Sequence, residues 1–262
     1  MVIPKIIHYC WLSGEPIPQK YRECMDTWKK VMPEYEWVRW DLDRFDIKSN
    51  RWVSEAYQCK KYAFAADYIR LYAVYTMGGI YLDMDVMVLK SFDDFLDNDF
   101  FTFNEFHPKL YLMAQSKNYV DKDGKRIKGT HVPYFGLQAA AFGGVKGSTY
   151  IKDLMSFYEN GKSFFEDDGS MCTDILAPYI YSVEAEKWGY RYKDKKQVLG
   201  KATIYPSSYF AGYTNLQTPE SYAVHVCVHG WKTKGPLLTR LKNKFNYWYG
   251  YVRYAMFRSV EP

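Results

Sequence analysis

Two carboxylates interrupt an apolar run in the first third of the chain. Residues 78–90 read Gly-Gly-Ile-Tyr-Leu-Asp-Met-Asp-Val-Met-Val-Leu-Lys, with Asp83 and Asp85 two positions apart. On an extended strand, side chains two positions apart project from the same face, so this spacing predicts two acidic groups side by side. Buried like charges need a counter-charge. Mg²⁺ or Mn²⁺ fits, because such ions bind one or two carboxylates together with substrate phosphates. The residues therefore predict a metal that holds a diphosphate.

The Asp-x-Asp spacing alone does not identify a metal site. It occurs four times, at Asp41/Asp43, Asp83/Asp85, Asp97/Asp99 and Asp121/Asp123. Three of these pairs lie in polar, loop-like segments, where aspartate commonly serves as a solvated turn residue. Only the second pair is embedded in a strand pattern. For that pair the alternative to a metal site is a strand end with solvated acids.

Composition indicates a globular protein with an unusual aromatic content. The chain has 262 residues, 48% apolar and 25% charged, which favours one large domain over two small ones. Aromatic residues reach 19%, with 26 Tyr and 8 Trp. Such rings suit stacking on sugars and bases, and equally suit ordinary cores and membrane interfaces.

Cysteine content and hydropathy indicate the cellular compartment in which we expect the protein. The five cysteines are widely spaced without a Cys-x-x-Cys pair, which argues against a disulfide framework or a zinc site and favours a reduced, cytoplasmic setting. The N-terminal segment is too short and polar for a signal peptide, and no run of about 18 apolar residues occurs. We therefore expect a protein that is neither exported by a standard signal nor membrane-spanning.

The N-terminal residues predict a strand-helix-strand unit. Segment 3–11 has the pattern of a buried strand, 19–30 of an amphipathic helix and 35–40 of a second strand. Such a unit implies a parallel sheet, which binds ligands at the carboxyl ends of its strands. Trp11 lies at that end of the first strand. It either stacks on a nucleotide base or is a core tryptophan at a strand edge.

A long helical pattern leads into the Asp83/Asp85 segment. It covers residues 54–77 and ends at a Gly-Gly pair. Asp67 and Arg70 are three positions apart within it and share a helix face. They form either a surface ion pair or part of a ligand site. In a ligand site Arg70 would contact a phosphate or sugar hydroxyl, and Asp67 would accept a hydrogen bond from the sugar. Further along, the predicted strand 100–106 places Asn104 and Glu105 either at an acceptor or in solvent.

Three segments together resemble a known family. Residues 3–11 (IPKIIHYCW), 63–70 (AFAADYIR) and 78–85 (GGIYLDMD) look like the sugar-binding region with the Asp-x-Asp motif of glycosyltransferase family 32. That family includes bacterial polysaccharide transferases and fungal mannosyltransferases, and it is related to the glucosylating domains of clostridial toxins. The resemblance covers roughly the first hundred residues.

The resemblance implies a fold and a chemistry. The expected fold is α/β, of the GT-A type that binds nucleotide sugars, with a mostly parallel central sheet flanked by helices. The expected cofactor is Mn²⁺ or Mg²⁺, and the expected donor is a nucleotide-diphosphate sugar, a UDP-hexose before GDP-mannose. Transfer is expected to retain the anomeric configuration.

The resemblance also implies roles by position. Trp11 lies against the base, Asp67 and Arg70 at the donor sugar, Asp83 at the ribose and metal, and Asp85 is a direct metal ligand. Segment 137–144 resembles a family strand near the acceptor. The family more often has Asn where this chain has Gln138, which leaves the role of Gln138 open.

A second informative stretch lies at residues 223–232. It contains His225 and His229, and histidine is a common ligand of first-row metals. In the family, a late His and a following Trp close over the donor, and spacing matches them to His225 and Trp231. We favour His225 for the metal or diphosphate, with His229 as the alternate and a core histidine as the remaining interpretation.

The C-terminal residues 236–262 differ in composition from residues 1–235, which we assign to the transferase domain. They interleave aromatic residues with five basic ones, Arg240, Lys242, Lys244, Arg253 and Arg258. This pattern favours either a helix in the headgroup region of an anionic membrane or a helix docked on the domain. Nucleic acid is not expected as a partner, because no binding motif accompanies the charges. The expected location is the cytoplasm, with a peripheral position at the inner face of the membrane as the alternative.

Together these patterns predict a metal-dependent, retaining hexosyltransferase in polysaccharide biosynthesis, such as capsule formation, with a glycan acceptor carried on a lipid. A divalent cation would stabilise the charge that builds on the leaving diphosphate. No protein nucleophile is required if the leaving phosphate receives the acceptor proton. The alternatives are a non-catalytic sugar-binding or membrane-associated scaffold, and a toxin-like enzyme that glycosylates protein.

Overall fold

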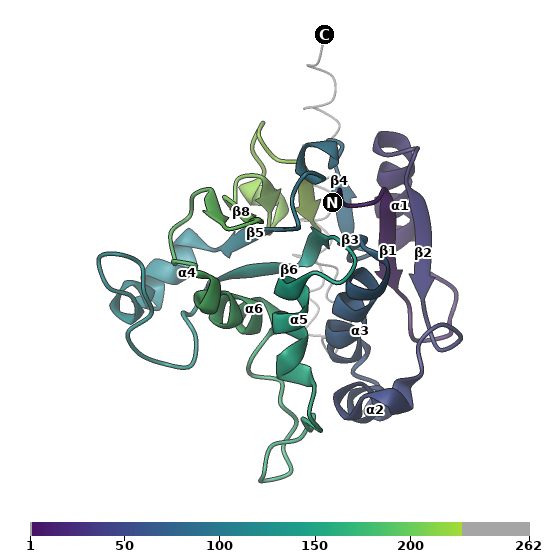
Figure 1. The fold of residues 1–262 in the computed structure, drawn as a ribbon, viewed down its shortest axis with the longest axis horizontal. Helices are drawn as coiled ribbons and strands as arrows, with labels where there is room; N and C mark the ends of the chain where they lie inside the picture. The colour runs from purple at the N-terminus through teal and green to yellow at the C-terminus, as the bar shows by residue number, and fades with distance from the viewer. Residues whose placement is uncertain (1, 227–262) are drawn as a thin grey trace, which may run out of the picture.

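A seven-stranded sheet forms the centre of the molecule. The structure, a computed structural model, describes residues 2–226 (Figure 1). In spatial order the strands are β2 (Glu36–Trp40), β1 (Ile6–Cys10), β3 (Gly79–Leu82), β6 (Phe135–Gly144), β5 (Phe100–Phe106), β8 (Ala202–Tyr205) and β7 (Gln197–Leu199). Five of the seven strands run in one direction, and only β6 and β7 are reversed. The predicted α/β class with a mostly parallel sheet is confirmed.

Helices cover both faces of this sheet. On one face, α3 (Tyr62–Met77) packs on β1, β3 and β6, and contacts α2 (Arg51–Gln58) and α5 (Thr149–Met155). Next to them, α6 (Ala177–Ala185) packs on β6. The other face carries α1 (Gln19–Val31) and a small sheet of β4 (Val86–Val88), β10 (Ala223–His225) and β9 (Phe210–Ala211). Each face buries its own apolar cluster, so both sides of the sheet contribute to the core.

The predicted helix over 54–77 is two helices. The chain leaves α2 at Cys59 and enters α3 at Tyr62, with Lys60 between them in the left-handed region at φ 57°. The indole of Trp52 donates to the carbonyl of Phe64 at 2.9 Å and fastens the corner. The apolar periodicity continues through this corner, because both helices bury their faces in the same cluster, so periodicity alone does not reveal the break.

The prediction of one extended strand through Asp83 and Asp85 is wrong. Strand β3 ends at Leu82, the chain turns through residues 83–85, and β4 begins at Val86 in the second sheet. The backbone N–H of Val86 donates to the Asp83 carbonyl at 3.0 Å, which closes the turn. The apolar residues after the turn belong to a different sheet, where the indole of Trp28 donates to the Val86 carbonyl at 2.7 Å.

The Gly-Gly pair allows α3 to pass directly into β3. Gly78 and Gly79 both have positive φ, 73° and 117°, which favours glycine. A Cβ atom on Gly79 would lie 2.7 Å from the carbonyl oxygen of Ile6. The glycines therefore let β3 pair beside β1 immediately after the helix, and this fixes the turn that carries the two aspartates.

His8 fastens the same junction from the neighbouring strand. It is fully buried, the Trp40 indole N–H donates to its Nδ1 at 3.1 Å, and its Nε2 lies 2.8 Å from the Gly78 carbonyl. This arrangement fits the neutral ring with its proton on Nε2, because a proton on Nδ1 would face another N–H. Burial lowers the pKa of His8 to about 4, against the opposing effect of the Gly78 carbonyl.

We expect the His8 imidazole to lower the free energy of unfolding of the wild type, relative to a His8→Gln variant, as pH falls from 6.5 toward 4. In the unfolded chain His8 binds a proton near its ordinary pKa, whereas burial prevents its protonation in the folded chain. The lowered pKa of His8 in the folded chain therefore reduces stability only at pH values below the ordinary pKa. The full effect over this window is about 3 kcal/mol. Urea unfolding at pH 7 and pH 4.5 measures it. Between these pH values the wild type should lose more stability than His8→Gln, which keeps one donor and one acceptor, and equal changes in both proteins would contradict this explanation.

Candidate active site

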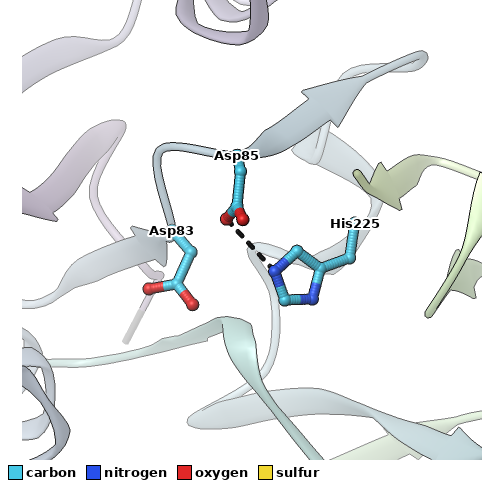
Figure 2. A group of neighbouring side chains, drawn as sticks. All are labelled: Asp83, Asp85 and His225. Carbon is cyan, nitrogen blue, oxygen red and sulfur yellow. Dashed lines mark hydrogen bonds and ion pairs between the residues drawn. The ribbon is translucent and has the colours of Figure 1, made fainter. Parts of the chain in front are cut away.

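Three side chains of types that commonly bind metal ions meet at the turn between β3 and β4. Asp83 and Asp85 come from the turn itself, and His225 ends β10 (Figure 2). One ligand atom from each lies within 4.8 Å of the other two, and His225 Nε2 is 3.1 Å from Asp85 Oδ1. Strand β10 pairs antiparallel with β4 and places His225 opposite Val86. That pairing brings a residue 140 positions away to the side of Asp85.

The chemistry of this set fits a divalent cation. Two carboxylates and one imidazole suit Mn²⁺, which accepts oxygen and nitrogen ligands, whereas Mg²⁺ prefers oxygen alone. The side chains of Asp83, Asp85 and His225 remain 26%, 14% and 22% exposed. An ion held by them would keep positions open toward solvent, where a phosphate could complete its shell.

A buried ion pair lies beside these residues. Arg70 Nη2 is 3.0 Å from Asp67 Oδ1 and 3.7 Å from Asp83 Oδ1, and Arg70 Nη1 donates to the Ala139 carbonyl at 2.9 Å. Arg70 is 5% exposed and Asp67 7%, so the surface ion pair left open by the sequence is excluded. The guanidinium is held from two sides and joins Asp67 to the turn that carries Asp83.

Burial and neighbouring charges set the protonation of this group. Burial raises the pKa of the Asp67 carboxyl to about 7, with Arg70 opposing and Asp83 adding to the rise. For Arg70, burial acts to lower the pKa, but the negative charge of Asp83 and other nearby groups holds it well above its ordinary value. The Tyr81 hydroxyl donates to Asp83 Oδ1 at 2.7 Å. Arg70 thus remains charged, and Asp67 can exchange a proton near neutral pH.

The residues of this group line one cavity of about 660 Å³. Its lining includes Trp11 and Tyr21, whose rings meet edge-on with centroids 5.7 Å apart. The Trp11 indole donates to the Glu15 carbonyl at 2.6 Å, which fixes the ring. Trp11 is partly buried, lines this cavity and also packs against the apolar cluster on its face of the sheet. The same cavity is lined by Asp67, Arg70, Asp83, Asp85 and His225.

A second polar group on the cavity wall contains Glu105 and Gln138, whose roles the sequence left open, and His107, which the sequence did not single out. His107 Nε2 lies 3.4 Å from Glu105 Oε1, and the His107 ring is 5.0 Å from the ring of Tyr213. Beside them Gln138 is 1% exposed, and neither atom of its amide has a hydrogen-bond partner within residues 2–226. A buried amide without partners costs free energy unless a ligand or water satisfies it. The signal in the sequence is a lone polar residue in the apolar run 135–144.

Some predicted residues lie outside the described part of the chain. His229, Trp231, the tail 236–262 and the domain boundary before it all fall within residues 227–262. Within residues 2–226, no helix combines the length and apolar character needed to cross a bilayer.

A family model matches the part of the chain that builds most of this site. Residues 18–102 match the model described as a glycosyltransferase sugar-binding region containing the DXD motif. The chain carries this sugar-binding region. It includes Asp67, Arg70, Asp83 and Asp85, whereas Trp11, Gln138 and His225 lie outside the matched residues. The resemblance to family 32 is confirmed, and the seven-stranded sheet flanked by helices agrees with the α/β fold that the resemblance implied.

Glycosyltransferases are among the proteins whose sequences match parts of the chain. An uncharacterised glycosyltransferase of Acanthamoeba polyphaga mimivirus is 36% identical over 106 residues, 38% of this chain and 42% of the relative. Inositol phosphoceramide mannosyltransferase 3 of Schizosaccharomyces pombe is 35% identical over 98 residues, 36% of this chain and 27% of the relative. The matches therefore span less than half the length of either relative.

Solved structures resemble the chain over a longer stretch at low identity. The PaToxG glycosyltransferase is 17% identical with a TM-score of 0.47, covering 71% of this chain and 70% of its own. The galactosyltransferase LgtC, solved with donor and acceptor sugar analogues, is 11% identical with a TM-score of 0.44, covering 94% and 95%.

Proposed function

We propose that the protein transfers a hexose, with retention, from a nucleoside diphosphate sugar to a hydroxyl of a glycan or lipid-linked saccharide, with the help of Mn²⁺ or Mg²⁺. The observation that carries this proposal is the convergence of Asp83, Asp85 and His225 on a cavity that also contains the Asp67–Arg70 pair. A scaffold that only bound sugar would have no use for a metal-binding set beside a buried guanidinium.

The geometry suggests how the donor is held. The base would lie against Trp11, with Tyr21 closing the side of that ring, and the diphosphate would lie at Asp83, Asp85 and His225. A divalent ion bound there stabilises the charge of the leaving diphosphate as a Lewis acid.

The sugar would lie toward the buried ion pair. Arg70 offers a fixed guanidinium for a sugar hydroxyl or phosphate oxygen. Asp67, with its pKa raised to about 7, can accept a hydrogen bond from a sugar hydroxyl when ionised. Tyr81 holds Asp83 in place through its hydroxyl. We assign no protein nucleophile, and the leaving phosphate would take the acceptor proton.

We place the acceptor hydroxyls at Glu105, His107 and Gln138. These side chains supply acceptors and donors suited to vicinal hydroxyls, and the Gln138 amide lacks a partner among the described residues. A lipid-linked acceptor is supported by the names of several relatives, which are inositol phosphoceramide mannosyltransferases.

A donor panel tests the proposal. UDP-glucose, UDP-galactose, their N-acetyl derivatives and GDP-mannose are incubated with the protein and Mn²⁺, and nucleotide release is measured. We expect release from one donor, a UDP-hexose before GDP-mannose, with product NMR showing the donor's own anomer. If no donor is bound or cleaved, the scaffold alternative replaces this function. Label from the active donor that enters protein, and not lipid, in a lysate would support the toxin-like alternative.

Gln138→Leu is expected to weaken the acceptor site selectively. The leucine fills similar space but removes both polar atoms of the amide, so transfer to a methyl hexoside should fall about 10- to 100-fold through a higher KM. The dissociation constant of the nucleotide with Mn²⁺, measured by calorimetry, should not change. Gln138→Asn, which keeps the amide, should lose less. Equal losses in nucleotide binding and transfer would place Gln138 at the donor.

A further inference from the structure

An exposed apolar surface lies beside the cavity. The short helix α4 (Pro108–Met113) and the hairpin that follows it expose four large apolar side chains, which we call the α4 surface. They are Leu110, Leu112, Met113 and Ile127, with 37%, 69%, 71% and 61% of each exposed. Single exposed apolar residues are common, but two adjacent ones exposed by about 70% with others nearby indicate a binding surface.

Backbone contacts hold together the segment that carries these side chains. Helix α4 packs on the 3₁₀ turn Ser116–Tyr119. Val120 pairs with Arg126 as an antiparallel bridge, and the Ile127 N–H donates to the Tyr119 carbonyl at 2.8 Å. Figure 1 shows α4 and the loops after it at the left edge of the molecule, projecting from the body of the fold. The surface is therefore ordered by its own contacts and open to a large partner.

Positive charge surrounds the apolar side chains. Residues 108–128 contain six basic residues and only two acidic ones. Lys109, Lys117 and Lys128 are exposed, and among residues 2–226 none of them has a carboxylate oxygen within 4.0 Å. One of the two acids, Asp121, accepts backbone N–H groups of its own turn. The lysines are thus available to an anionic partner.

We propose that the α4 surface binds an anionic membrane. Leu112 and Met113 would enter the headgroup region while the surrounding lysines contact lipid phosphates. A protein groove is a poorer match, because the apolar side chains lie on a projecting segment whose exposed lysines have no carboxylate partner among the described residues. Helix α4 starts directly after His107, which lines the cavity, so membrane binding would bring that part of the cavity near the lipid surface. This inference goes beyond the proposed function and does not depend on it.

Vesicle sedimentation of the full chain tests the inference. The variant Leu112→Asp/Met113→Asp is compared with wild type on phosphatidylcholine vesicles with and without phosphatidylserine. A matched control, Leu42→Asp/Val198→Asp, places the same charges at positions that are 45% and 66% exposed elsewhere. We expect wild type and control to bind the anionic vesicles only, and the α4 variant to bind about tenfold less, since it loses apolar contact and gains repulsion.

Two results would overturn the proposal. One is failure of wild type to bind phosphatidylserine vesicles, and the other is equal binding by the α4 variant and the control. Sedimentation velocity without vesicles tests the remaining alternative. If wild type and control form a dimer and the α4 variant does not, the α4 surface would be assigned to contact with a second copy of the chain. Circular dichroism and nucleotide binding of both variants verify that they are folded. Because vesicle binding is read without donor, its outcome is independent of the transferase assay.

Discussion

Asp85→Asn is expected to abolish nucleotide release in the presence of Mn²⁺, by about a thousandfold or more if the leaving diphosphate loses its cation. The amide has nearly the shape of the carboxylate but no charge, and it is a poor ligand for a hard cation. Asp85 is 14% exposed in a turn, and its backbone carbonyl still accepts from the Val226 N–H at 2.9 Å, so the fold should persist.

Nucleotide release and urea unfolding are measured on the same samples of the Asp85→Asn variant. The matched control is Asp43→Asn, which alters another Asp-x-Asp pair at an exposed position outside the cavity. We expect the control to behave as wild type in both measurements. Full activity of Asp85→Asn would refute the assigned role, whereas loss of both activity and folding would show that Asp85 is structural.

Arg70→Met should have the largest effect on stability. Removing the guanidinium leaves the Asp67 carboxyl and the Ala139 carbonyl without their partner in a buried site, and such losses typically cost about 3–5 kcal/mol. Activity should be lost as well, because Arg70 also lies 3.7 Å from Asp83. Urea unfolding and nucleotide release, measured in parallel, separate the two effects.

The double variant Asp67→Asn/Arg70→Met identifies the cause of that instability. Without the carboxylate, no unpaired charge remains in the site, so the double variant should be more stable than Arg70→Met alone. Activity should stay absent, since both proposed sugar contacts are gone. If the two variants unfold at the same urea concentration, the instability comes from lost packing and not from the orphaned carboxyl.

The sequence predicted the local parts of this site well. Asp67 and Arg70 are three positions apart in α3, and a helix determines that they share a face whatever the rest of the chain does. Similarly, the N-terminal strand-helix-strand unit follows from short-range periodicity and is present as β1, α1 and β2. Spacing alone was sufficient wherever one element carries both residues.

The rest of the site depends on contacts between distant segments. Asp83 and Asp85 converge with His225 because the chain turns after β3 and β4 then pairs with β10, an arrangement that an alternating pattern does not contain. Glu105 follows an irregularity in the pairing of β5 with β6, between Thr102 and Asn104. Such a shift changes where later side chains point, so the sequence left Glu105 open between an acceptor and solvent and did not single out His107.

The measurement that tests the central claim most directly is Mn²⁺ binding followed by electron paramagnetic resonance. Free Mn²⁺ is titrated with wild type and with Asp85→Asn, each with and without UDP or GDP. If Asp83, Asp85 and His225 hold the ion, wild type should take up a single Mn²⁺, more tightly with nucleotide, and the variant should lose this binding while it remains folded. Equal Mn²⁺ binding by both proteins, or no binding by wild type with either nucleotide, would contradict the account.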